Sequence, residues 1–124
     1  TSGVSDEPIT QHAVEQEILR LSRLLDTATT QIAKRARDAA TKRATAKIDL
    51  ARAFLEARGI TEINGRPPSA DYCEASARVA CADQVIAQEM ADAVLLGAQE
   101  AARNTRSQLD ALRSVAANAR HLVT

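Results

Sequence analysis

Apolar side chains recur every three or four residues over most of the chain, which is the spacing of one face of an α-helix. In the first half this stripe comprises Ile18, Leu21, Leu25, Ala28, Ile32, Ala36, Ala40, Ala44, Ile48, Ala51 and Leu55. In the second half it comprises Val79, Ala82, Ile86, Met90, Ala93, Gly97, Ala101, Gln108, Leu112, Val115, Ala119 and Leu122. The alternation typical of β-strands does not occur outside the middle segment. The pattern therefore predicts an all-α protein with two long helices, about residues 8–58 and about 70–122.

Residues 59–69 separate the two stripes and carry the residues that end helices and form turns. Gly59 follows Arg58, in the place where a glycine commonly ends a helix. Asn64-Gly65 favours a turn, and Pro67-Pro68 disfavours helix before Ser69. We therefore expect one turn here, with the second helix folding back along the first.

Both predicted helices have candidate capping residues at their beginning. Ser5, Asp6 and Thr10 are candidates for the first helix, and Ser69 or Asp71 for the second. Residues 26–31, with three threonines, are the weakest part of the first helix, because β-branched residues lower helix propensity. The apolar stripe keeps its spacing across them, so we expect a continuous helix.

The charges along the chain form blocks of alternating sign. Residues 1–32 carry five acidic and two basic side chains, and residues 33–58 carry three acidic and eight basic ones. Residues 71–100 carry six acidic and one basic, and residues 101–124 one acidic and four basic. A chain folded near residue 64 places each block beside one of opposite sign. The blocks therefore predict an antiparallel, coiled-coil-like hairpin.

The length of 124 residues indicates a single domain, 1–124. Apolar side chains also lie off the main stripes, at Leu19, Leu24, Leu50, Val85, Leu95, Leu96 and Leu109. A two-helix hairpin would leave much of this surface exposed. Dimerisation into a four-helix bundle would bury it, and 26 alanines would allow close helix spacing. A monomer whose helices break and fold into a compact bundle is the alternative.

Residues with catalytic or metal-binding chemistry are sparse. His12 and His121 lie near opposite ends of the chain, without a cysteine beside them, and make a poor zinc site. Cys73 has no nearby histidine to activate it as a nucleophile. Cys73 and Cys81 are too far apart on one helix for a disulfide, so we expect buried thiols, with a disulfide between subunits as the alternative. The phosphate-binding glycine motif is missing. We expect no enzyme, no metal and no cofactor.

A basic segment on the first helix is the candidate for nucleic-acid contact. Its six basic residues are Lys34, Arg35, Arg37, Lys42, Arg43 and Lys47. Such a segment could follow a phosphate backbone. The six residues are scattered around the helix axis, however, and no aromatic residue that could stack on bases lies nearby. A solvated face complementary to the acidic partner helix is the competing interpretation.

The chain carries no signal that would direct it into a membrane. The apolar run Ala93–Ala98 is too short to span a bilayer, and the first residues lack the charged-then-apolar pattern of a signal peptide, so we expect neither a membrane span nor a signal peptide. We expect a soluble protein in the cytoplasm of a bacterial host.

Two stretches resemble a known group of proteins. The first is AFLEARG, residues 53–59, and the second is LRSVAANAR, residues 112–120. They are similar to the helix ends of small, uncharacterised helical proteins of actinobacterial phages and prophages, over roughly residues 44–122. The inserted INGRPP, residues 63–68, departs from that group, and no active site carries over. Ser114 and Arg120 are the candidate partner contacts within the matching stretch, since helical alanine spacing does not require them. The alternative interpretation is that Ser114 is simply a serine near the end of a helix and that Arg120 interacts favourably with the helix dipole there.

The resemblance implies an accessory role in phage DNA metabolism. We therefore expect a non-enzymatic, oligomeric helical protein that acts through protein–protein contacts, with a replication or recombination protein, or an inhibited host factor, as its unidentified partner. Direct DNA binding through Lys34–Lys47 is the alternative.

Overall fold

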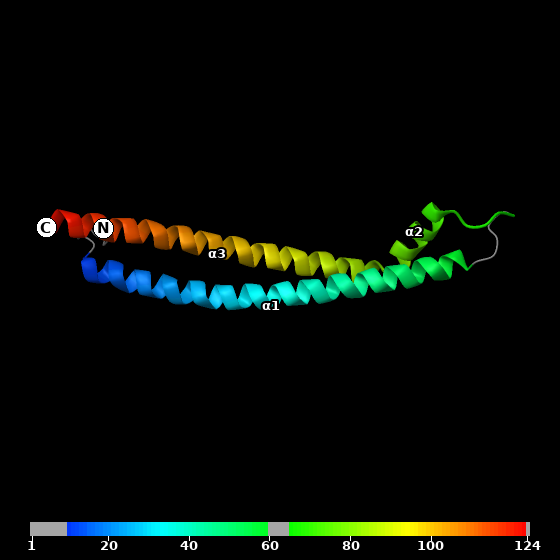
Figure 1. Cartoon of the computed structure of the whole chain (residues 1–124), viewed down its shortest axis with the longest axis horizontal. Helices are drawn as coiled ribbons and strands as arrows, with labels where there is room; N and C mark the ends of the chain where they lie inside the picture. The colour runs from blue at the N-terminus through cyan, green and yellow to red at the C-terminus, as the bar shows by residue number, and fades with distance from the viewer. Residues whose placement is uncertain (1–9, 60–64, 124) are drawn as a thin grey trace, which may run out of the picture. The chain divides into compact units, whose positions relative to one another are not determined.

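The computed structural model describes residues 10–59 and 65–123 as backbone, with side chains up to Arg120. These residues form three helices: α1 (Gln11–Arg58), α2 (Ala70–Ala80) and α3 (Ala82–Val123). The long helices α1 and α3 pack against each other in opposite directions (Figure 1). The predicted all-α helical hairpin is therefore confirmed. The predicted features at Ser5, Asp6 and Asn64 lie outside the described residues.

The ends of α1 follow the sequence signals. At its beginning the backbone N–H of Ala13 donates to the Oγ1 atom of Thr10 at 3.1 Å, so Thr10 is the N-terminal cap. At its end the N–H of Gly59 donates to the carbonyls of Leu55 and Glu56, at 3.0 and 3.1 Å. These bonds satisfy backbone groups that a helix end would otherwise leave without partners.

The threonine-rich part of α1 is helical throughout, as expected. The hydroxyls of Thr27, Thr29 and Thr30 each donate to the carbonyl four residues earlier, at 3.1, 2.9 and 3.3 Å. Each hydroxyl thus has a hydrogen-bond partner within the helix itself. The three β-branched residues are thus accommodated in a continuous helix of 48 residues.

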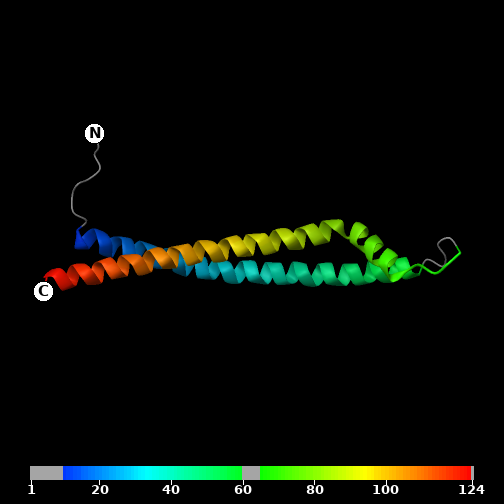
Figure 2. The ribbon, with the colours of Figure 1, turned by 90° about the horizontal axis from the view of Figure 1, so that it is seen from above.

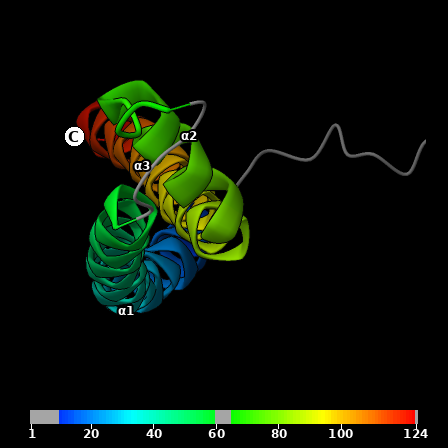
Figure 3. The same cartoon turned by 90° about the vertical axis from the view of Figure 1, so that its right-hand side faces the viewer.

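The second predicted helix, about 70–122, is divided at Cys81 into α2 and α3, and this is a correction to the sequence prediction. Ser69 caps α2 by accepting the N–H of Tyr72 at 3.1 Å. Cys81 has φ −108° and ψ 25°, so the chain changes direction there, as Figure 2 shows. Seen along the long axis in Figure 3, α2 is set at an angle to α3.

The bend is a local departure of one residue from helical backbone angles, because the ψ of 25° at Cys81 lies outside the helical range. The hydrogen bonds continue across it: the N–H of Cys81 donates to the carbonyl of Ala77 at 2.9 Å, and its carbonyl accepts from the N–H of Val85 at 3.0 Å. Cys73, Ala77 and Cys81 are all buried, and both thiols are free. The expectation of buried thiols is confirmed.

The buried face of each long helix follows a spacing of seven residues. In α1 one column of buried or half-buried side chains contains Ile18, Leu25, Ile32, Ala39, Ala46 and Ala53. In α3 the two columns contain Ala91, Ala98, Thr105, Leu112 and Ala119, and Gln88, Leu95, Ala102, Leu109 and Ala116. This is the spacing of a coiled coil, in which one narrow seam faces the partner helix. We call the whole face of α1 or α3 that contains these columns the seam.

The predicted apolar stripes therefore differ from the seam over much of their length. In the first stripe Ala40, Ala44, Ile48, Ala51 and Leu55 are exposed. In the second stripe only Leu112 and Ala119 are half-buried among the described side chains, and the rest are exposed. The prediction that the second stripe is the buried face of its helix is therefore wrong. Most of its residues are exposed instead of being packed against α1. Leu95 and Leu109, which lie off that stripe, belong to the seam.

The hairpin divides into two compact units. The terminal unit combines the described residues up to Ile32 with those from Ala98 onward, and the central unit is Ala33–Gly97. In the terminal unit the buried side chains include Val14, Leu21 and Leu109. In the central unit every buried side chain among the described residues is small: Ala39, Ala46, Ala57, Cys73, Ala77, Cys81 and Ala91.

Candidate interaction surface

The six predicted nucleic-acid contacts lie on α1 within the central unit, but they do not share one face. Arg43 donates to the Oδ1 atom of Asp92 on α3 at 2.9 Å. Lys42 lies 3.7 Å from the carboxylate of Asp38 on its own helix. Lys34, Arg35, Arg37 and Lys47 are exposed, and none forms an ion pair with a described residue. The segment thus retains four unneutralised cations that point in different directions.

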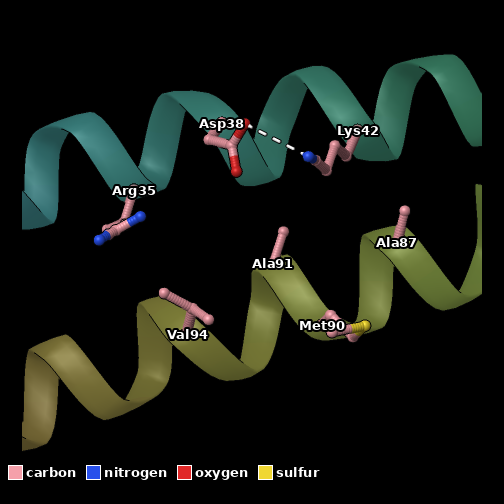
Figure 4. Close-up of a pocket in the computed structure, with 7 residues that line it drawn as sticks. All are labelled: Arg35, Asp38, Lys42, Ala87, Met90, Ala91 and Val94. Carbon is pink, nitrogen blue, oxygen red and sulfur yellow. Dashed lines mark ion pairs between the residues drawn. The ribbon is translucent and has the colours of Figure 1, made fainter.

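Arg35, Asp38 and Lys42 form the charged side of a groove between α1 and α3 (Figure 4). The other side comes from Ala87, Met90, Ala91 and Val94 of α3. Figure 4 shows Ala87 and Ala91 directed toward α1, with the ion pair between Asp38 and Lys42 spanning one helical turn. The groove has a volume of about 270 Å³, which falls below the roughly 300–1,000 Å³ of usual small-molecule sites. It is a junction between packed helices with one apolar and one charged side.

The two predicted partner contacts, Ser114 and Arg120, are exposed on α3 in the terminal unit. Six residues of separation place them about 120° apart around an ideal helix. The helix thus presents them to different sides, and they do not form one cluster.

Groups that could hold a metal are not assembled in the part of the chain with described side chains, where three or more His, Cys, Asp or Glu residues do not come together. His12 is exposed near the start of α1, and the side chain of His121 lies outside the described set. None of the described helices is both long enough and apolar enough to cross a membrane.

Large apolar side chains are exposed mainly in the central unit. Among the described residues they are Ile48, Leu55, Tyr72, Val79, Ile86, Met90, Val94 and Leu96 in the central unit, and Leu19, Leu24 and Val115 in the terminal unit. Val79 is 79% exposed, Leu55 65% and Met90 64%. Exposed apolar side chains gathered in one region of a soluble protein indicate a site of interaction.

Within the central unit the exposed apolar residues form an ordered row on each long helix. On α1 the row is Ala44, Ile48, Ala51 and Leu55, which we call the α1 outer row. On α3 it is Ala82, Ile86, Ala93 and Leu96, which we call the α3 outer row. Each row contains two alanines and two large aliphatic side chains, and each lies on the side of its helix away from the seam. Most of these residues belong to the apolar stripes that the sequence pattern predicted as the buried faces.

In the terminal unit the clearest electrostatic feature is local. The pKa of Glu17 lies below its ordinary value, mainly because the guanidinium of Arg20 donates hydrogen bonds to the carboxylate, one of them from Nε at 3.0 Å. The same contact raises the pKa of Arg20. Both side chains are on the surface of α1, and the pair stabilises the charged forms of these two residues. It does not contribute to a binding site.

Comparison with known proteins leaves the chain without an assigned family: no family model, no curated protein and no solved structure matches it.

Proposed function

We propose that this chain is a non-enzymatic, oligomeric helical protein that acts through protein–protein contacts. The observation that carries the proposal is the placement of the large aliphatic residues in the central unit. The fully buried side chains described there are all alanines or cysteines, while Ile48, Leu55, Ile86 and Leu96 are more than half exposed.

Burial of this surface by another protein chain would be favourable. Fully burying a Leu or Ile side chain contributes roughly 1.5–3 kcal/mol relative to leaving it exposed. Ile48, Leu55, Ile86 and Leu96 are 54%, 65%, 53% and 56% exposed, so a partner that completed their burial would gain part of this free energy at each of them. A helix of a partner fits this surface best, because side chains at spacings of three and four residues match the groove of another helix.

The resemblance to helical proteins of actinobacterial phages and prophages supports a setting for this activity. We propose a phage or prophage protein that assists, or inhibits, DNA replication or recombination machinery in the cytoplasm of a bacterial host. The protein partner in that machinery is a replication or recombination protein or a host factor.

The first test is the solution mass, measured by light scattering after size exclusion over a range of protein concentrations. We expect species larger than a monomer. Ile48→Lys and Ile86→Lys should shift the mass toward the monomer, because each places a charge in the exposed apolar surface. Leu24→Lys is the matched control, since Leu24 is 46% exposed but belongs to the terminal unit. A native chain that remains monomeric at every concentration contradicts the proposal of an oligomer.

Direct DNA binding is the second candidate function. It is favoured by Lys34, Arg35, Arg37 and Lys47, which are exposed and form no ion pair with any described residue. It ranks second because Arg43 is bound to Asp92 and the four other cations do not follow one line along α1.

A titration with short single-stranded and double-stranded DNA at two salt concentrations tests this candidate. Phosphate contacts predict an affinity that falls steeply with salt. Arg37→Gln with Lys47→Gln should weaken binding, whereas Arg23→Gln in the terminal unit should leave it unchanged. Absence of binding at low salt would exclude the candidate.

A further inference from the structure

The two outer rows of the central unit have the spacing of a second coiled-coil seam. In the α1 outer row the steps between Ala44, Ile48, Ala51 and Leu55 are four, three and four residues. The α3 outer row follows the same steps from Ala82 to Leu96, with Glu89 taking one place in the series. Rows with this spacing present a continuous narrow face to a partner helix.

The charges beside the two rows are of opposite sign. Within residues 33–58 of α1, Arg37, Arg52 and Arg58 lie on the outer side, within about 60° of the direction opposite Ala46 on an ideal helix. No acidic residue of this stretch lies in that sector. Residues 82–97 of α3 contain no basic residue. Their acidic residues are Asp83, Glu89 and Asp92, of which Asp92 binds Arg43. Glu89 is exposed at the centre of the α3 outer row and has no ion-pair partner among the described residues.

From these two features we infer that the partner of the central unit is a second copy of this chain, with the α1 outer row of one copy packed on the α3 outer row of the next. This inference rests on the proposed function and gives the oligomer a specific interface. Apolar residues of similar size would meet along the rows. The arginines beside one row would face the glutamate within the other, so like charges would not be buried together.

The position of the rows also sets the kind of assembly. Each row lies opposite the seam of its own helix, so the two rows face away from each other within one central unit. One partner copy therefore occupies one row and leaves the other row open for a further copy. Such a head-to-tail interface is heterologous, and it adds copies in series unless the rotation between them closes a ring. It differs from a two-fold dimer, in which like rows would meet.

Charge reversal on one row at a time tests this interface. R37E/R52E makes the surroundings of the α1 outer row acidic, and E89K makes the α3 outer row basic. Each variant alone should weaken self-association about tenfold or more, because like charges then face each other. An equimolar mixture of the two variants should recover association, since the reversed rows are complementary again. The readout is sedimentation velocity at increasing concentration, with circular dichroism to confirm unchanged helix content.

Two controls and three outcomes decide the result. Arg23→Glu and Glu15→Lys reverse exposed charges of the terminal unit and should leave association unchanged. Recovery in the mixture, together with species that grow beyond a dimer in the native chain, supports the inference. A discrete native dimer that both variants retain overturns it and leaves the proposed oligomer standing. A native monomer at every concentration overturns both proposals.

Discussion

The terminal and central units use the same seven-residue spacing but fill it with different side chains. Val14, Leu21 and Leu109 are buried in the terminal unit, whereas the central unit buries only alanines and cysteines among its described residues. The exposed residues show the opposite trend, since eight of the eleven large exposed apolar side chains in the described part of the chain belong to the central unit. Large side chains thus contribute to the fold in one unit and remain available at the surface in the other.

The difference indicates how one long helix can serve two purposes. A buried leucine removes more apolar surface from water than a buried alanine, so Leu21 and Leu109 contribute more to stability than the buried alanines of the central unit do. Alanines allow two helix backbones to approach closely, and the contact then depends on fit more than on the amount of buried surface. The central unit can therefore hold its helices together while Ile48, Leu55, Ile86 and Leu96 are directed outward.

The largest effect on stability is expected from a substitution that creates a cavity in the terminal seam. Leu21→Ala should lower the free energy of unfolding by about 2–5 kcal/mol, because Leu21 is only 2% exposed and its removal leaves a void. Leu24→Ala on the same helix is the control and should cost much less, since Leu24 is 46% exposed. Urea unfolding followed by circular dichroism measures both. Equal losses for the two variants would show that the terminal seam is not the stabilising part.

The reverse substitution tests the central seam. Ala46→Leu adds three carbons at a fully buried position and should destabilise the chain by about 1–3 kcal/mol through overpacking. Ala40→Leu, at an exposed position of the same helix, should change stability by about 0.5 kcal/mol or less. Thermal unfolding of both variants gives the comparison. A gain of stability from Ala46→Leu would mean that the central helices are separated widely enough to accept a larger residue.

The ion pair between α1 and α3 in the central unit should have a smaller effect. A double-mutant cycle with Arg43→Ala and Asp92→Ala should give a coupling of about 0.2–1 kcal/mol, because both side chains are partly exposed. The coupling should fall as salt is added. A coupling of zero at low salt would remove this pair from the contacts that hold the two helices together.

The smallest expected effect concerns Glu17 in the terminal unit. Its lowered pKa in the folded chain means that its contribution to stability is present above the pKa of the unfolded chain and is lost as the pH falls through the folded pKa. An NMR titration of the Glu17 carboxyl should give a pKa below the ordinary value. Arg20→Gln should return the pKa to that value, while Arg23→Gln should not. An unchanged pKa in the Arg20 variant would contradict the assigned cause.

The sequence predicted those parts of the fold that depend on local signals. Thr10, Ser69 and Gly59 mark helix ends through bonds to nearby backbone groups, and these bonds form in the structure. The opposite charge blocks predicted the antiparallel pairing, and Arg43 with Asp92 is one contact of that kind. The bend at Cys81 could not be predicted in this way, because no proline or glycine lies there.

The candidate interaction surface could be predicted only in part, and the reason lies in the alanines. Ala44 and Ala46 are the same residue two positions apart, yet one is exposed and the other fully buried. Apolar character therefore does not tell the seam from the outer row. Polar residues also enter the central seam, where Asp49 accepts a hydrogen bond from Gln84 at 3.3 Å, and a purely apolar pattern passes over them. The spacing of seven was the signal that could have separated the two faces.

The alanine column of the central unit has a consequence for how α1 is aligned lengthwise. Ala39, Ala46 and Ala53 are identical and seven residues apart, so a slip of α1 by seven residues, about 10 Å, would replace one alanine by another. Packing of this column alone does not distinguish the two alignments. The polar contacts Arg43 with Asp92 and Asp49 with Gln84 each occur once, so the same slip would break both of them. In this unit the polar contacts therefore favour the observed alignment, which the three alanines leave open.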